Sequence, residues 1–261
     1  MPKIGVVGGS GLYQIPGLSI REYKHLTTPF GDPSDSFMIG ELSGKEIVFL
    51  PRHGFEHHIP PHRINYRANI RGFKELGVER ILSIGAVGGM GYEITTGMII
   101  IYDQIIDMTK NRDFTFYDGD EVIHIDFTDP YCPELRESLF KAAENSGTEL
   151  RKSGTYVCMN GPRLETRAEI KMFLDMGIDI VGMTAMPEAA LAREAEICLA
   201  GVAVVTNYAA GITGKRLTTT EVIATMKEAT AHIGNLLLET LHLIPSERGC
   251  SCKDVLREAR I

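Results

Sequence analysis

Short apolar runs constrain the fold of this chain more than any other feature. Most of them are apolar at consecutive positions rather than alternate ones, which is typical of strands buried on both faces of a parallel or mixed sheet. The runs are Ile4–Val7, Glu46–Leu50, Arg80–Ile84, Met98–Asp103, Thr155–Met159, Ile178–Val181 and Ile197–Thr206. They predict the strands of one central sheet.

Segments with helical periodicity lie between several of these runs. Ile64–Leu76, Pro133–Asn145 and Glu165–Met176 each stop at or near a glycine, a residue that commonly ends a helix. Thr220–Leu243 carries its apolar residues on one face, and a threonine of the run Thr218–Thr220 is the expected cap. The alternation predicts an α/β single domain with a mixed central β-sheet flanked by helices.

Length and composition bound the domain organisation and the partners. The chain has 261 residues, 44% of them hydrophobic, and shows no linker or low-complexity run. We expect one domain over residues 1–245 and a C-terminal tail with a Cys-x-Cys pair over 246–261. The net charge is −7 with scattered Lys and Arg, which argues against a nucleic-acid groove.

No apolar segment approaches the roughly 20 residues that cross a bilayer. The N-terminal residues do not resemble a signal peptide, because glycines stand where an apolar stretch is needed. We therefore expect a cytoplasmic protein without a membrane partner.

The cysteines fall into two groups. Cys132, Cys158 and Cys198 lie in apolar or structured-looking sequence and are expected to be small core hydrophobes. Cys250 and Cys252 lie in the polar tail, which offers too few ligands nearby for zinc, so no metal site is expected. A disulfide, if the source is a hyperthermophile, and two exposed thiols without a catalytic role remain alternatives.

Polar loops follow six of the predicted strands. In open α/β sheets, ligands bind outside the carboxyl ends of the strands, so these loops predict a binding site. The loops are residues 8–11, 51–54, 85–89, 160–163, 182–188 and 207–211.

Several of these loops suit an anion. The glycines around Ser10 offer backbone N–H groups and a hydroxyl, while Gly85, Ala86 and Thr184 would add further amides and a second hydroxyl. A dinucleotide-binding turn is the competing interpretation. It requires a glycine at position 14, which is Gln14, and an acidic residue on a second strand that is not found.

Arg52 and His53 point more sharply to phosphate. The guanidinium fork matches two phosphate oxygens at once, and the neighbouring imidazole would add another donor. Three more histidines follow by position 62, but Glu56 is the sole acid nearby, so a metal is less well supported than phosphate.

Glu165 and Asn207 stand just past two of the predicted strands. A carboxylate only accepts hydrogen bonds, whereas an Asn amide both donates and accepts. Together they complement a 6-oxopurine edge: Glu165 would accept from the ring N–H, and Asn207 would bond N7 and the exocyclic oxygen.

Taken together, these segments resemble the trimeric purine nucleoside phosphorylase and methylthioadenosine phosphorylase family. The resemblance runs from Ile4 to about Leu243 and rests on collinear matches. These are VVGGSGLY, PRHGFEHHIPPHRINYRANI, FYDG, MNGPRLETRAE and GMTAMPEAALAREA. It implies a phosphate-dependent enzyme without a cofactor, assembled as a homotrimer or a dimer of trimers.

The resemblance also assigns individual positions. It implies a phosphate site of Ser10, Arg52, His53, Ala86 and Thr184. Met183 would pack on the ribose, and Asn207, Tyr208 and Ala209 would form the base loop. His124 would be lent by a neighbouring subunit to the sugar's 5′ side, which would otherwise be lined by Thr219, Val222 and Ile223.

One departure bears on the substrate. The adenine-specific enzymes carry aspartates in a TDYD base loop, whereas this chain reads Thr206-Asn207-Tyr208-Ala209 and has Glu165 after Leu164. Both changes are similar to the 6-oxopurine branch and favour inosine, guanosine or methylthioinosine. The alternatives are a methylthioadenosine phosphorylase, a Rossmann-type oxidoreductase and a non-catalytic nucleoside-binding protein.

Overall fold

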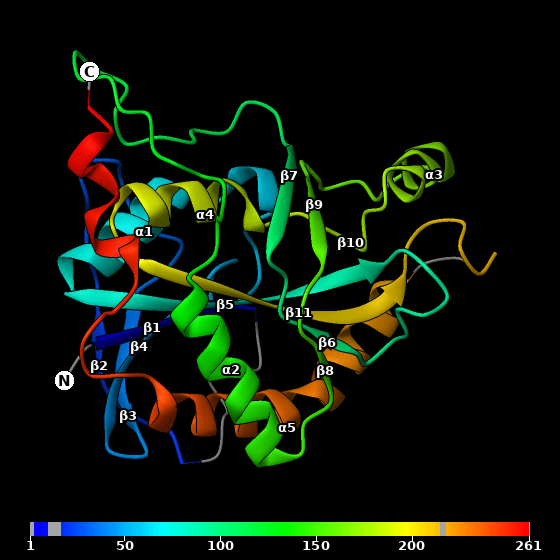
Figure 1. Ribbon diagram of the computed structural model, residues 1–261, viewed down its shortest axis with the longest axis horizontal. Helices are drawn as coiled ribbons and strands as arrows, with labels where there is room; N and C mark the ends of the chain where they lie inside the picture. The colour runs from blue at the N-terminus through cyan, green and yellow to red at the C-terminus, as the bar shows by residue number, and fades with distance from the viewer. Residues whose placement is uncertain (1–2, 10–16, 215–217, 261) are drawn as a thin grey trace.

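The computed structural model describes residues 3–9, 17–214 and 218–260, in which helices cover both faces of a central mixed sheet (Figure 1). The strands are β1 (Lys3–Gly8), β2 (Ser19–Lys24), β3 (Phe37–Leu42), β4 (Lys45–Pro51), β5 (Val78–Gly89), β6 (Ile99–Ile100), β7 (Gln104–Met108), β8 (Leu150–Arg151), β9 (Thr155–Met159), β10 (Ile180–Gly182) and β11 (Cys198–Tyr208). The helices are α1 (Tyr66–Glu75), α2 (Pro133–Ser146), α3 (Arg167–Asp175), α4 (Ala185–Glu194) and α5 (Thr219–Leu243), with short 3₁₀ helices η2 (Pro61–Arg63) and η3 (Ser251–Glu258).

The predicted α/β sheet is confirmed, with corrections at its margins. Residues 98–103 were expected to form a strand, but only the two residues of β6 do so. The polar edge strand β2 was missed because five of its six residues are exposed, so it carries no apolar run. The expected ends of two helices are confirmed, since Gly147 has a left-handed φ of 65° after α2 and Thr218 caps α5 by accepting from the Glu221 N–H.

β5 organises the sheet because three strands pair with it. β1 runs parallel to its first half, up to Ser83, while β10 pairs antiparallel with Gly88 and Gly89 on the same edge. β11 runs parallel along the opposite edge. Within the described residues, positions 84–87 of β5 therefore have a strand partner on one edge only.

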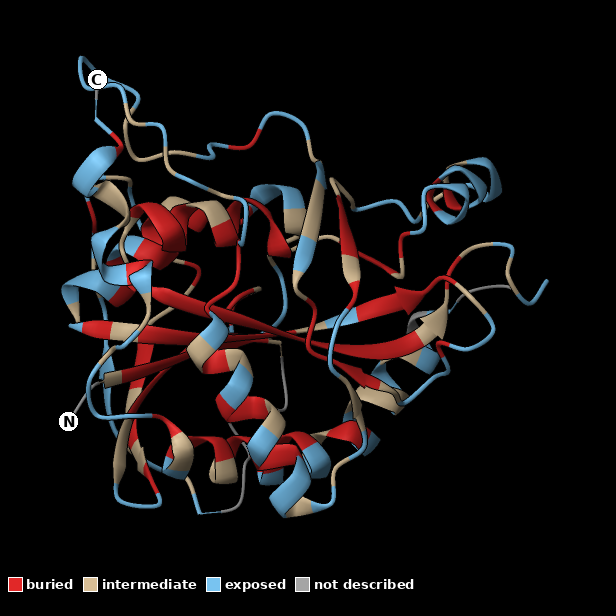
Figure 2. Cartoon of the chain, in the orientation of Figure 1, coloured by how far each residue is buried: buried red, intermediate tan, exposed pale blue. Residues whose placement is uncertain are grey.

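Each face of the sheet has its own core. α2 and α5 pack together on one face, over side chains that include Ile4, Leu82 and Val202. α1 and α4 cover the other face, where Phe73 of α1 packs in one cluster with Ile81 of β5. Figure 2 shows the central strands almost wholly buried, whereas α3 stands apart and is largely exposed.

The C-terminal tail folds back onto the domain. The Gly249 N–H donates to Glu134 of α2 over 2.8 Å, and the Arg248 guanidinium donates to the Glu196 carbonyl over 2.7 Å. Cys252 is 2% exposed, so the expectation of two exposed thiols is wrong for this residue. Among the described helices, none is both long and apolar enough to span a bilayer.

The contact between Phe37 and Phe73 allows a test of the core. Phe73 is fully buried and meets Phe37 edge-on, with ring centroids 5.0 Å apart. We expect Phe73→Ala to lower the free energy of unfolding by about 3–5 kcal/mol, measured by chemical denaturation. The exposed Tyr23→Ala is the control and should change it by less than about 0.5 kcal/mol. Equal losses in both variants would contradict this account of the core.

Candidate active site

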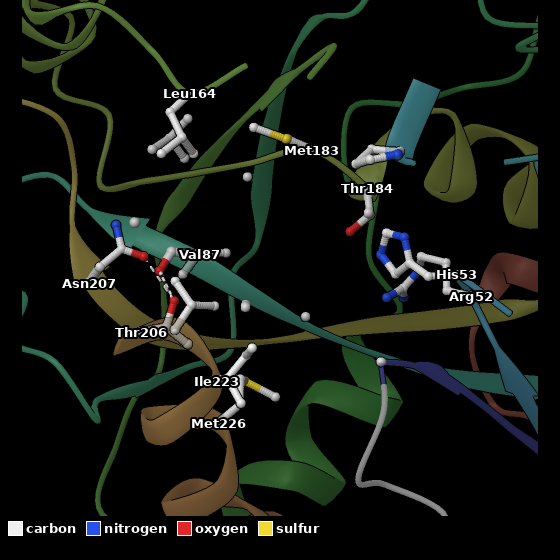
Figure 3. Close-up of a pocket in the computed structure, with 18 of the residues that line it drawn as sticks. Arg52, His53, Val87, Leu164, Met183, Thr184, Thr206, Asn207, Ile223 and Met226 are labelled. Carbon is white, nitrogen blue, oxygen red and sulfur yellow. Dashed lines mark hydrogen bonds between the residues drawn. The ribbon is translucent and has the colours of Figure 1, made fainter. Parts of the chain in front are cut away.

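A cavity of about 600 Å³ lies where the carboxyl ends of the central strands meet (Figure 3). It is lined by the loops after β1, β4 and β10, by the open segment of β5, by the end of β11 and by one face of α5. Sequence positions as distant as 9 and 230 contribute to it. The expected site at the strand ends is therefore a real cavity.

The cavity brings together most of the predicted residues. Those that line it are Arg52, His53, Gly85, Ala86, Glu165, Met183, Thr184, Asn207, Ala209, Val222 and Ile223. Two predicted residues are not among the lining ones. Tyr208 presents its carbonyl to Asn207, and His124 is exposed beside the C-terminal tail, where its N–H bonds the Ala259 carbonyl. Ser10 and the side chain of Thr219 lie outside the described residues.

Arg52 is held by a buried ion pair at the gap in the sheet. Its Nε donates to Glu188 Oε2 over 2.8 Å, and both side chains are 2% exposed. Nη2 donates within the same network, to Ser83 Oγ at 2.9 Å and Glu188 Oε1 at 3.1 Å. Burial lowers the pKa of the guanidinium, but the facing carboxylate more than offsets this and raises it. Arg52 is therefore permanently charged.

The bidentate phosphate contact predicted for Arg52 is wrong. An arginine has five N–H donors. Glu188, Ser83 and the Val7 carbonyl occupy Nε and Nη2, and Nη1 donates to the Ile84 carbonyl. One Nη1 hydrogen is left without an acceptor among the described residues. Arg52 can therefore donate one N–H to a ligand in the cavity, and its positive charge is balanced by Glu188.

His53 is fixed in one tautomer. Its Nδ1 lies 2.8 Å from the Ile59 carbonyl, which can only accept, so Nδ1 carries the hydrogen. Burial is the main reason why the pKa of His53 falls to about 4, with Arg52 and His57 adding to the effect. The neutral ring presents Nε2 as an acceptor. The donor role predicted from sequence is therefore corrected, and His53 suits a P–OH group.

The open edge of β5 contributes a backbone donor. The Ile84 carbonyl points to this edge, where the Arg52 guanidinium meets it, and the Val87 carbonyl points towards β11. Backbone groups of successive strand residues alternate between the two edges. The Ala86 N–H therefore faces the cavity. The Gly85 N–H faces β11, which corrects its predicted role as an amide donor.

Thr184 stands beside this edge. It occupies the N-cap position of α4, and its hydroxyl makes no hydrogen bond to any described residue. A side-chain carbon placed on Gly85 would lie 3.6 Å from Thr184 Oγ1, so the glycine leaves room next to the hydroxyl. Thr184, His53 and Arg52 together form one end of the cavity (Figure 3).

Asn207 lies at the opposite end, near Leu164 (Figure 3). Its Oδ1 accepts from the Thr206 hydroxyl over 2.9 Å, and its Nδ2 donates to the Tyr208 carbonyl over 2.9 Å. One N–H and one oxygen lone pair remain for a ligand. A side chain on Gly88 would lie 3.3 Å from Nδ2, so this glycine makes room for the amide.

Glu165 precedes Thr166, the N-cap of α3, and is half-buried. Burial is the main cause that raises the pKa of its carboxyl group, and the nearby Glu169 raises it further. Arg163 pairs with Glu169 over 2.7 Å rather than with Glu165. The Glu165 carboxyl group is therefore left to accept from a ligand.

Two buried residues that the sequence did not single out hold this geometry. Glu188 anchors Arg52, as above, and its signal was a charge within the apolar stretch after Met183. Arg112 donates to the carbonyls of Met183 and Asn160, over 2.9 and 2.8 Å, and so ties two cavity loops together. No pattern around Arg112 marked it, because its partners are backbone carbonyls distant in sequence.

Among the described residues, the histidines near the cavity form no group that could hold a metal ion; the one convergent set of ligand side chains is four cysteines elsewhere. Fold and cavity are those of an α/β protein with a small-molecule site at the strand ends, and one end of the site offers donors suited to an oxyanion. The Phosphorylase superfamily matches residues 3–242, and the chain belongs to this family.

Individual relatives are similar over nearly the whole chain. A probable 6-oxopurine nucleoside phosphorylase of Thermococcus kodakarensis is 53% identical, covering 99% of both chains. A probable S-methyl-5′-thioinosine phosphorylase of Thermodesulfovibrio yellowstonii is 50% identical, covering 98% of this chain and 97% of the relative. A solved methylthioadenosine phosphorylase from an antarctic soil metagenomic library superposes with a TM-score of 0.93 at 37% identity, covering 100% of this chain and 92% of the other.

The environment of His53 predicts its titration. Because burial disfavours the charged ring, we expect the ligand-free protein to titrate at His53 near pH 4, with the Nδ1–H tautomer above it. The unfolded chain takes up this proton near the ordinary value of about 6.5, so His53 makes unfolding easier as the pH falls from 6.5 to 4. Imidazole NMR, assigned with His53→Gln, measures the midpoint, and a value near 6.5 would contradict the burial argument.

The ion pair beside the cavity predicts a stability cycle. Glu188→Ala leaves the Arg52 charge buried without its partner and should cost about 3–5 kcal/mol of unfolding free energy. The double variant Arg52→Met with Glu188→Leu removes both charges and should cost clearly less. Chemical denaturation of the three proteins gives the comparison. A double variant at least as unstable as Glu188→Ala would show that the loss does not come from an unpaired buried charge.

Proposed function

We propose that this protein is a phosphate-dependent nucleoside phosphorylase that cleaves 6-oxopurine nucleosides to the free base and (5-methylthio)ribose 1-phosphate. The observation that carries the proposal is the two-ended cavity. Donors for an oxyanion lie around Thr184 and the edge of β5, and the side-chain amide of Asn207, which can bond a purine, lies at the other end. Relatives named for the same reaction are about half identical over the full length.

The anion end suits inorganic phosphate. The Ala86 N–H, the Thr184 hydroxyl and the remaining Arg52 N–H can donate to its oxygens, and Ser10 is expected to add a hydroxyl. The neutral His53 Nε2 can accept the hydrogen of HPO₄²⁻. No metal or other cofactor is needed for this step, because phosphate itself is the nucleophile.

The base end suits a 6-oxopurine. Asn207 donates to the exocyclic oxygen or N7, and Glu165 accepts from the ring N–H. Adenine-type bases reverse the pattern at position 6, and buried groups left unpaired give strong discrimination. A methylthioadenosine phosphorylase is the second candidate, because the solved structure described above carries that name.

The reaction relies on position and charge. Breaking the glycosidic bond develops positive charge on the ribose and negative charge on the leaving purine. Phosphate held at the anion end beside Thr184 stabilises the charge on the ribose and then attacks the sugar, while Asn207 stabilises the charge at N7 and the 6-oxygen. No side chain has to act as a nucleophile.

The 5′ side of the sugar would face α5. Val222, Ile223 and Met226 make most of this wall apolar, beside Lys227 and Thr230, and the apolar part fits a methylthio group. Ile223 is 68% exposed and Leu164 is 51% exposed, and a second copy could cover both. We propose a homotrimer or a dimer of trimers in which the exposed His124 reaches a neighbouring cavity. A cytoplasmic location and purine salvage belong to the same proposal.

A comparison of substrates tests the function. Purified protein is assayed with and without phosphate on inosine, guanosine, methylthioinosine and methylthioadenosine, with release of free base and sugar 1-phosphate as readouts. We expect phosphate-dependent turnover that is faster for the 6-oxopurines. Fastest turnover of methylthioadenosine would favour the second candidate, and base release without phosphate would contradict both.

Asn207→Asp tests the reading of the base. An ionised aspartate cannot donate to the 6-oxygen, and an unpaired buried acceptor costs about 1–3 kcal/mol, so kcat/KM for inosine should fall about 10- to 100-fold. The loss with 6-aminopurine nucleosides should be smaller. Asn145→Asp on the exposed side of α2 makes the same chemical change away from the cavity and is the control. Unchanged inosine kinetics in Asn207→Asp would show that Asn207 does not read the base.

A further inference from the structure

Four of the five cysteines converge at the end of β11 opposite to the cavity. Cys198 begins β11, Cys132 precedes α2, and Cys250 and Cys252 lie at the start of η3. Their sulfur atoms all lie within 4.8 Å of one another, and the chain holds them as free thiols. The expectation that the tail lacks ligands was wrong, because the fold brings Cys132 and Cys198 to it.

The spacing suits a single tetrahedral metal ion. A zinc ion with four thiolates has Zn–S bonds of about 2.3 Å, which places the sulfurs about 3.8 Å apart. The Cys198 and Cys250 sulfurs are 3.3 Å apart, so closing the site needs adjustments of only a few tenths of an ångström to about 1 Å. A four-thiolate tetrahedron favours zinc over calcium or magnesium, which prefer oxygen ligands.

The surroundings carry positive charge. Arg193 is 8% exposed and directs Nη1 at Cys252 Sγ over 3.6 Å. Arg80 is fully buried and is the register partner of Cys198 on β5, so both side chains leave the same face of the sheet. Arg80 Nε has no hydrogen-bond partner among the described residues, and its two carboxylate partners, Glu79 and Glu134, lie at the long distances of 3.5 and 3.4 Å. Two guanidinium groups suit a dianionic zinc tetrathiolate better than they suit neutral disulfides.

The site is also preformed and accessible. The tail is held by Glu134 and by Glu196, whose carboxylate accepts from the Leu256 N–H over 3.4 Å. Cys132, Cys198 and Cys252 are buried, whereas Cys250 is half-buried and leaves a route of entry.

We propose that Cys132, Cys198, Cys250 and Cys252 bind one Zn²⁺ ion as a structural tetrathiolate site. The ion fastens the C-terminal tail to the starts of α2 and β11. Its four protein ligands leave no open position for a substrate, so its role is structural.

Metal and thiol content of the full-length protein test the proposal. Tag-free protein, produced with zinc in the medium and dialysed against metal-free buffer, should contain about one zinc per chain by elemental mass spectrometry. Unfolding in guanidinium with EDTA should then release five reactive thiols. Co²⁺ in place of zinc should give thiolate-to-metal charge-transfer absorption. These three measurements use the unmodified protein, so they do not depend on whether a variant folds.

Substitutions assign the ligands. Cys250→Ser with Cys252→Ser should reduce zinc to background, whereas Cys158→Ser should retain about one zinc per chain, since Cys158 lies outside the cluster against the Met186 carbonyl. Two fewer reactive thiols for each disulfide would overturn the proposal. Five thiols without metal after exposure to ZnCl₂, or iron in place of zinc, would overturn it as well.

Discussion

The buried ion pair between Arg52 and Glu188 is the interaction on which the cavity depends. Where β1 has ended and β10 has not begun, β5 would expose backbone groups to a void. Arg52 fills this place and takes the Ile84 carbonyl as a strand would, and Glu188 offsets the buried charge. Because the arginine covers the edge only at Ile84, the next outward-facing amide, that of Ala86, stays free for a ligand.

Much of the fold could be predicted from sequence because the central strands carry apolar side chains on both faces. β1, β4, β9 and β11 were placed within about two residues of their observed ends, the margin usual for strand boundaries. The periphery could not be predicted in this way. β2 is exposed at five of its six residues and no residue of β7 is fully buried, so neither strand carries a run of buried apolar side chains. The branching of the sheet at β5 depends on contacts between distant segments.

The site was predicted in its membership more than in its bonding. Glycine, hydroxyl and amide residues after strands identified where a ligand binds, and the resemblance to known enzymes supplied the two ends. No sequence pattern indicated which of the donors were already used within the protein. Arg52 has one donor left because Glu188, which is 136 residues away in the sequence, occupies others. His53 offers Nε2 as an acceptor because its Nδ1–H is bonded to the Ile59 carbonyl. Both corrections come from partners that no local pattern shows.

The two ends of the cavity differ in how they are built. Around Ala86 the anion would contact backbone groups and the buried ion pair of Arg52 and Glu188. A single substitution cannot change these groups without destabilising the fold. At Asn207 and Glu165 the ligand meets side chains on loops, and these can be exchanged at little structural cost. Preferences for different nucleobases can therefore diverge within one lineage while the phosphorolytic half stays constant.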